Sequence, residues 1–155
     1  MVVHVEQSSE FSYSRQSRSK SQKDSLYLLS VQGFQYCDLL LSTSPANKVF
    51  KRAEYVLNSS LKGTTILSIA LARLTLGRVY LQQSTEQAER HAENQADAFK
   101  YLNLAVDELR KAGIRHYEPL GLLSRATYYC HTQQFALAHE DLAEVLDIAE
   151  PSGMR

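Results

Sequence analysis

A spacing of small and branched residues recurs three times in this chain and constrains its fold more than any other feature. In each copy, one such residue is followed by a second four positions later and by a third three positions after that. The copies are Val49, Ala53 and Val56; Ala98, Leu102 and Ala105; and Ala138, Leu142 and Val145. Offsets of three and four residues place side chains on one face of an α-helix. The chain is therefore expected to be built from repeated helical units.

Start and stop signals divide the chain from residue 25 onward into six expected helices. Proline is favoured in the first turn of a helix, and glycine is favoured at its left-handed C-terminal cap. On this basis Pro45 and Pro119 open helices, while Gly113 ends one. The helices are expected to pair into three antiparallel hairpins, at residues 25–61, 65–113 and 117–150.

A polar stretch at residues 82–97 makes the middle hairpin longer than the other two. Tyr80 and Ala98 are eighteen positions apart, whereas the corresponding residues of the other hairpins are nine apart. The stretch is rich in helix-forming residues, so we expect it to lengthen the fourth helix by about two and a half turns. On that extension Glu86 and Arg90 have the spacing of an i,i+4 ion pair.

Composition favours an intracellular, water-soluble protein. Seventeen basic and seventeen acidic residues cancel, which argues against a nucleic-acid or anionic-membrane partner because these attract a net basic surface. The two cysteines, Cys37 and Cys130, fall within expected helices, as is usual in a reducing compartment. No signal peptide and no uninterrupted run of 18 apolar residues occurs. We expect no membrane segment and a cytoplasmic location.

Residues 1–24 differ in composition from the rest of the chain. They are rich in serine, with Arg15, Arg18, Lys20 and Lys23 interleaved, and they lack apolar periodicity. Such a segment buries too little apolar area to offset the entropy of ordering it. We expect a flexible tail, with a phosphorylatable basic arm for an acidic partner as the alternative.

The segment Leu76-Gly77-Arg78-Val79-Tyr80 carries the Leu-Gly-x-x-Tyr core of a tetratricopeptide first helix. With residues 33–41 and 105–113, it makes the chain from about Ser25 onward resemble tetratricopeptide-repeat proteins, particularly the irregular repeats of bacterial signal-transduction ATPases and related regulators. The consensus tryptophan is absent, and the repeats exceed 34 residues. The resemblance implies an all-α fold, a right-handed superhelical stack of three antiparallel helix hairpins. It also implies a non-catalytic interaction scaffold without a cofactor.

In such a stack, the first helix of each hairpin lines a concave groove that binds a protein or peptide partner. The groove-facing side chains are then expected to be Phe34, Asp38, Leu41, Leu74, Arg78, Leu81, Leu123, Thr127 and His131. Apolar anchors with a few polar groups suit an amphipathic helix or an extended peptide. Alternatively, Asp38 and Arg78 pair with each other, and Phe34, Leu74 and Leu123 belong to the core between repeats.

The densest group of reactive side chains does not form a recognisable catalytic or metal motif. Cys130 and His131 close one expected helix, while His139, Glu140 and Asp141 lie on the next, without a Cys-x-x-Cys or His-Glu-x-x-His spacing. We expect Cys130 to be a buried small apolar residue and His131 a surface residue, and we predict neither enzyme activity nor a metal site. The alternative function is sensing of a small ligand or a metal near Arg78, Cys130 and His131.

The sixth expected helix carries apolar residues without a following helix to cover them. Terminal repeats usually end in a helix with a polar outer face. Either the sequence is a fragment of a longer array, or another chain covers this face. We expect self-association as a homodimer, through a surface formed by Leu137, Leu142, Leu146 and Ile148.

Overall fold

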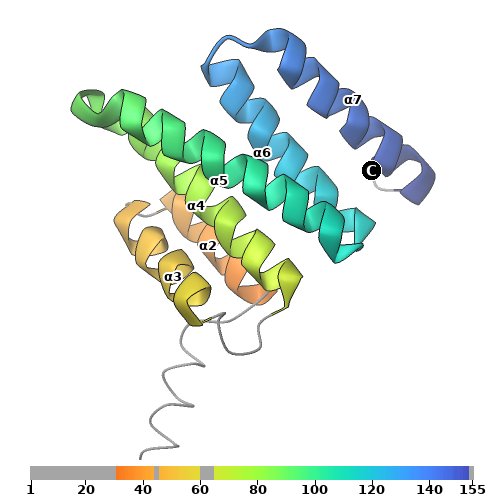
Figure 1. Ribbon diagram of the computed structural model, residues 1–155, viewed down its shortest axis with the longest axis horizontal. Coiled ribbons are helices and arrows are strands. Elements are labelled where there is room, and N and C mark those ends of the chain that lie inside the picture. The colour runs from red at the N-terminus through yellow and green to blue at the C-terminus, as the bar shows by residue number, and fades with distance from the viewer. Residues whose placement is uncertain (1–30, 44–45, 60–64, 154–155) are drawn as a thin grey trace, which may run out of the picture.

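The computed structural model describes residues 31–43, 46–59 and 65–153, and within these ranges every regular element is helical. The helices are α2 (Val31–Thr43), α3 (Ala46–Ser59), α4 (Ile66–Glu86), α5 (His91–Ala112), α6 (Glu118–His131) and α7 (Phe135–Ser152), with 3₁₀ turns at Ala88–Arg90 and Arg115–Tyr117 (Figure 1). The all-α class is confirmed. The expected tail at residues 1–24, the start of the first hairpin and Pro45 lie outside the described residues.

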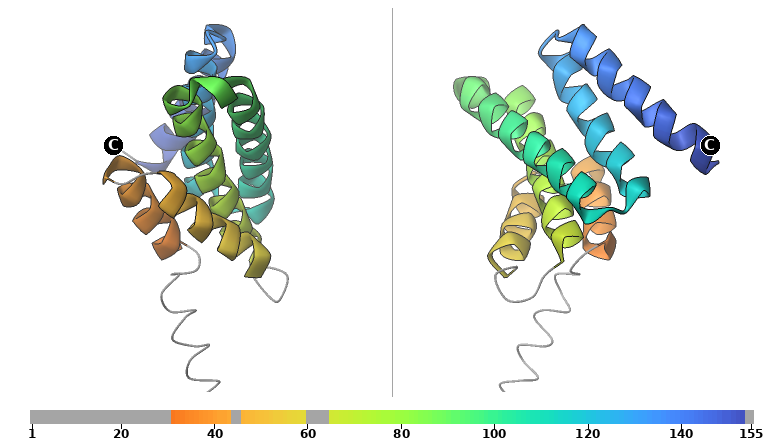
Figure 2. Two further views of the ribbon diagram at one scale, coloured as in Figure 1. Left: turned by 90° about the vertical axis from the view of Figure 1, so that its left-hand side faces the viewer. Right: turned by 45° about the vertical axis from the view of Figure 1, so that its right-hand side comes forward.

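The longest helices, α4 and α5, occupy the centre of the molecule and lie side by side. Helices α2 and α3 pack on one side of α4, and α6 follows α5 on the other side (Figures 1 and 2). Helix α7 packs on α6 and forms the outer edge of the molecule (Figure 1). Within the part of the chain that is described, no helix has both the length and the apolar character needed to cross a membrane.

Gly113 and Pro119 lie at helix ends as their residue types predicted, and Thr65 adds an N-cap that was not predicted. The hydroxyl oxygen of Thr65 accepts a hydrogen bond from the backbone nitrogen of Ser68 at 3.3 Å, so Thr65 caps the start of α4. Gly113 ends α5 with φ of +69°, a conformation that glycine adopts without a steric penalty. Pro119 lies in the first turn of α6.

The polar stretch at residues 82–97 lengthens two helices, so the prediction that it extends only the fourth helix is wrong. Helix α4 continues to Glu86, the chain turns at residues 87–90, and α5 begins at His91. Because both helices are extended, the added turns of α4 lie beside the added turns of α5. The expected Glu86–Arg90 pair is also wrong: Glu86 accepts a hydrogen bond from Gln82 at 2.8 Å, and Arg90 pairs with Glu93 at 3.0 Å.

The largest core cluster is formed by small and aliphatic residues of α4 and α5, together with residues of α2, α6 and α7. The second copy of the recurring pattern, Ala98, Leu102 and Ala105, is fully buried in it. In the third copy Ala138 is buried, but Leu142 is exposed. Val49 and Ala53 of the first copy are buried as well. The pattern therefore marks helix contacts on α3 and α5, and it fails at Leu142 of α7.

Candidate functional site

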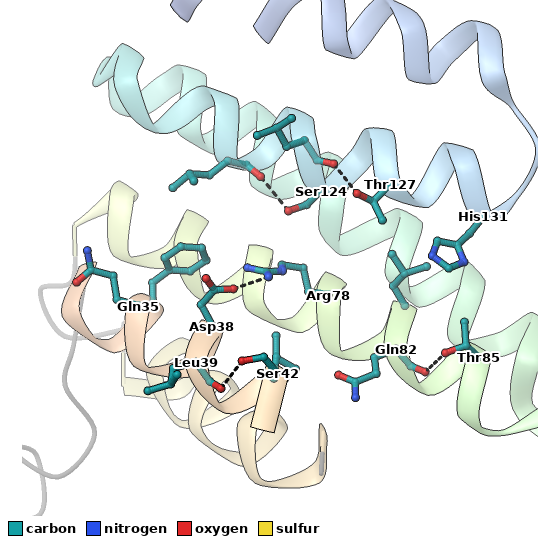
Figure 3. Close-up of a pocket in the computed structure, with 15 residues that line it drawn as sticks. Gln35, Asp38, Leu39, Ser42, Arg78, Gln82, Thr85, Ser124, Thr127 and His131 are labelled. Carbon is teal, nitrogen blue, oxygen red and sulfur yellow. Dashed lines mark hydrogen bonds and ion pairs between the residues drawn. The ribbon is translucent and has the colours of Figure 1, made fainter. Parts of the chain in front are cut away.

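A groove with a volume of about 880 Å³ lies across α2, α4 and α6 (Figure 3). Helix α4 packs against both of the other helices. In Figure 3, the labelled side chains of α2 and of α6 face one another across Arg78 and Gln82 of α4. The groove is thus formed by three helices that are separated in the sequence by α3 and α5.

Each helix contributes one face to the groove. On α4 the lining residues are Arg78, Leu81, Gln82 and Thr85, which follow the offsets of three, four and seven that keep side chains together on a helix. On α6 the same offsets recur from Leu120 to His131. The helical period therefore explains why these side chains converge on one space.

Eight of the nine side chains expected in a groove line this one. They are Phe34, Asp38, Leu41, Arg78, Leu81, Leu123, Thr127 and His131. The expectation for Leu74 is wrong, because it is fully buried in the core cluster that also contains Phe34 and against which Leu120 packs. Leu74 thus belongs to the core, as the alternative interpretation of the sequence predicted. Leu123, by contrast, is exposed in the groove and is not part of the core.

Seven further lining residues were not predicted: Gln35, Leu39, Ser42, Gln82, Thr85, Leu120 and Ser124. All of them lie one to four positions from an expected groove residue on the same helix. Extending the period by one more turn identifies Thr85 and Leu120, and an offset of three back from Thr127 identifies Ser124.

The charged groups of the groove largely neutralise each other. The guanidinium of Arg78 forms an ion pair with the carboxylate of Asp38, as the alternative interpretation of the sequence predicted. Arg78 also lies over the ring of Phe34, with 6.0 Å between the guanidinium carbon and the ring centroid. Among the described lining residues, no other Asp, Glu, Lys or Arg is present. The groove therefore offers little net charge to attract a highly charged partner.

The hydroxyl groups of the groove already donate their hydrogens to backbone carbonyls of their own helices. Thr127 donates to Leu123 at 2.8 Å and Ser124 to Leu120 at 2.9 Å, while on α4 Thr85 donates to Gln82 at 2.7 Å (Figure 3). Their oxygens retain lone pairs that can accept a hydrogen bond. A bound molecule therefore meets mainly hydrogen-bond acceptors on these positions, between apolar side chains.

The group of possible catalytic or metal-binding residues is not assembled into a site. Asp141 is buried and paired with Arg125. In the described ranges, no three His, Cys, Asp or Glu side chains lie close enough together to hold a metal ion. His131 is exposed, as expected, and lines the groove. Cys130 is exposed, so the prediction that it is buried is wrong.

Only half of the surface expected for self-association is formed as predicted. Leu142 and Leu146 are exposed on α7, but Ile148 is buried against Val106 of α5 and Leu122 of α6. Leu137 is partly exposed, yet nine positions separate it from Leu146, which places the two on opposite sides of the helix. The prediction is wrong for Ile148 because it grouped all the apolar residues of α7, including those that face α5 and α6.

Comparisons of the chain with protein-family models, with curated proteins and with solved structures find no match.

Proposed function

We propose that this chain is a non-catalytic interaction module that holds a segment of a partner protein in the groove between α2, α4 and α6. The observation that carries the proposal is the convergence of apolar side chains from three helices on one open groove of about 880 Å³. Six of the fifteen lining residues are apolar, and the remaining ones are distributed between them. Apolar anchors flanked by polar groups that fix register are typical of peptide-binding grooves.

We further propose that the architecture is the right-handed tetratricopeptide-like stack of helix hairpins that the sequence resembles. Support comes from the packing of consecutive helices, with α2 on α3, α4 on α5 and α6 on α7. It also comes from the groove, which takes its lining from the first helix of each of these pairs.

The dimensions of the groove suit a short amphipathic helix. Its lining on α6 runs from Leu120 to His131, a distance of about 16 Å at the rise of an α-helix. A partner helix of about three turns spans this length, with an apolar stripe towards Leu81, Leu123 and Phe34. Because Asp38 and Arg78 pair with each other, we expect the contacting face of the partner to be uncharged apart from its rim.

Site-specific photo-crosslinking tests this proposal. A photoreactive phenylalanine analogue at Thr127 of the full chain is expected to capture a protein partner from a lysate. The same analogue at Lys111, which is exposed on α5 away from the groove, serves as the control. A protein captured only from Thr127 supports the proposal, whereas identical products from both positions contradict it.

A second candidate function, sensing of a small ligand, is favoured by the size of the groove. Pockets for small molecules have volumes of roughly 300 to 1,000 Å³. Arg78 and His131 could orient an anionic or polar ligand there. Thermal stabilisation of the chain by a metabolite, together with no protein captured from Thr127, would favour this function over the first.

A further inference from the structure

One flank of α7 carries three large apolar side chains that no other described residue covers. Phe135, Leu142 and Leu146 are 65%, 41% and 58% exposed. Their offsets of seven and four place them in one stripe along the helix. Helix α7 is the outer edge of the molecule, with α6 between it and the central pair (Figures 1 and 2). The stripe is separate from the groove, since none of its residues lines it.

We propose that this stripe is an interface between two copies of the chain, formed by their α7 helices packed antiparallel about a two-fold axis. In an isologous pair, when one residue of the first copy contacts a second residue of the other copy, the same contact recurs with the two copies exchanged. An axis midway between Leu142 and Leu146 places Leu142 against Leu146 of the partner subunit, and the reverse contact is identical. The two leucines of each copy then form the centre of the interface, with Phe135 over the last turn of the other helix.

Charge complementarity favours the antiparallel arrangement over the parallel one. His139 and Glu150 are exposed and lie on the same side of the stripe. Antiparallel packing about this axis brings His139 to the level of Glu150 of the partner subunit, where the imidazole can donate a hydrogen bond to the carboxylate. Parallel packing would instead leave His139 and Glu150 of the partner subunit about 16 Å apart along the helices, so this contact could not form.

The area of the stripe indicates a weak dimer. The three side chains leave roughly 300 Å² of apolar surface open on each copy, against about 800 Å² per partner in a standard interface. Polar residues along the rest of α7, which is about 27 Å long, add to the contact. We expect dissociation in the micromolar range, so that the dimer forms at high local concentration.

Sedimentation equilibrium of the full chain tests the interface. The mass is expected to rise from 17.5 kDa towards twice that value as the concentration is raised from low to several hundred micromolar. Leu146→Glu should weaken association at least tenfold. Leu137→Glu is the matched control, because it makes the same change on the opposite side of the same helix, and it should leave association unchanged. If helicity is lost in Leu146→Glu, Phe135→Ser replaces it at a still more exposed position.

A compensating pair of changes tests the orientation. Leu142→Lys alone should weaken the dimer, whereas Leu142→Lys combined with Leu146→Glu should restore it, because antiparallel packing brings each lysine against a glutamate. A monomer at every concentration overturns the proposal, as does equal weakening by Leu137→Glu. A double variant that remains dissociated overturns the antiparallel arrangement. None of these outcomes depends on what the groove binds.

Discussion

The guanidinium of Arg125 holds both carboxylate oxygens of Asp141, with Nε donating to Oδ2 at 2.9 Å and Nη2 donating to Oδ1 at 2.6 Å. The third nitrogen of Arg125 donates to the side-chain oxygen of Asn103 at 3.1 Å. One side chain of α6 therefore connects α5 and α7. The hydrogen bond to Asp141 raises the pKa of Arg125 above its ordinary value, and the guanidinium stays charged although only 15% of the side chain is exposed.

Removing the carboxylate alone should destabilise the protein. Asp141→Leu leaves the charge of Arg125 largely buried without its partner, and we expect a loss of about 3 kcal/mol in the free energy of unfolding. Urea denaturation followed by circular dichroism measures it. The double change Arg125→Met with Asp141→Leu removes both charges, so it should cost less than Asp141→Leu alone. A double variant that is less stable than the single one would show that the pair itself, and not the isolated charge, determines the loss.

A close approach of α4 and α5 gives a second prediction, at Gly77. A methyl group on Gly77 would lie 2.7 Å from Cγ and 3.1 Å from the backbone nitrogen of Leu102. Alanine favours helix over glycine, but the contact is too short, so Gly77→Ala should destabilise the protein by about 1 to 3 kcal/mol. Thermal unfolding measures the change. In a Leu102→Ala background the side-chain overlap is gone, and the added methyl should then cost clearly less; an equal cost in both backgrounds would contradict the steric explanation.

The sequence predicted most of the groove lining, because the side of a helix on which a residue lies depends only on the helical period. Once the register of each first helix is known, Asp38, Arg78 and Thr127 fall on one side of their helices regardless of how the helices cross. Leu74 has the same register but is fully buried, within the core cluster that also contains Phe34. Burial of this kind depends on the distance between helices. The spacing of residues along one helix gives no information about that distance.

Apart from the Asp38–Arg78 pair, the contacts between helices could not be predicted from the spacing of residues along the sequence. Arg125 and Asp141 are sixteen residues apart, and their pairing depends on the length of the turn between α6 and α7. The sequence likewise gave no reason to place the turn of the middle hairpin at residues 87–90, because helix formers occupy both sides of it. At the edge of the molecule, Leu142 and Ile148 are equally apolar, and only the position of α5 and α6 decides which one is buried.

The two cysteines should differ strongly in reactivity. Cys130 is exposed, whereas Cys37 is buried, and burial raises the pKa of its thiol although the charge of Arg52 opposes the shift. A raised pKa lowers the thiolate fraction at neutral pH, and the thiolate is the reactive form. We expect iodoacetamide to modify Cys130 at least about tenfold faster than Cys37 in the native protein. Mass spectrometry of timed samples measures both sites.

Denaturant supplies the control for the cysteine prediction. In the unfolded chain the two thiols lose their different surroundings, so their rates should converge. A Cys130→Ser variant isolates the slow reaction of Cys37. Equal rates of modification of the two thiols in the native protein would contradict the burial of Cys37 against α3 and α4.

The ion pair in the groove gives a prediction that separates stability from binding. Asp38 and Arg78 are partly exposed, so Arg78→Glu should lower the stability by less than about 1 kcal/mol. The change nevertheless places two carboxylates side by side and makes a nearly neutral groove negative. We expect the affinity for a partner captured at Thr127 to fall at least about tenfold, because an apolar helix face cannot compensate the added charge.

The combination Asp38→Arg with Arg78→Glu restores the pair in reverse, and it should recover most of the affinity in isothermal titration calorimetry. If the reversed pair binds as weakly as Arg78→Glu alone, Arg78 itself contacts the partner, and the groove does not recognise its partner through neutrality.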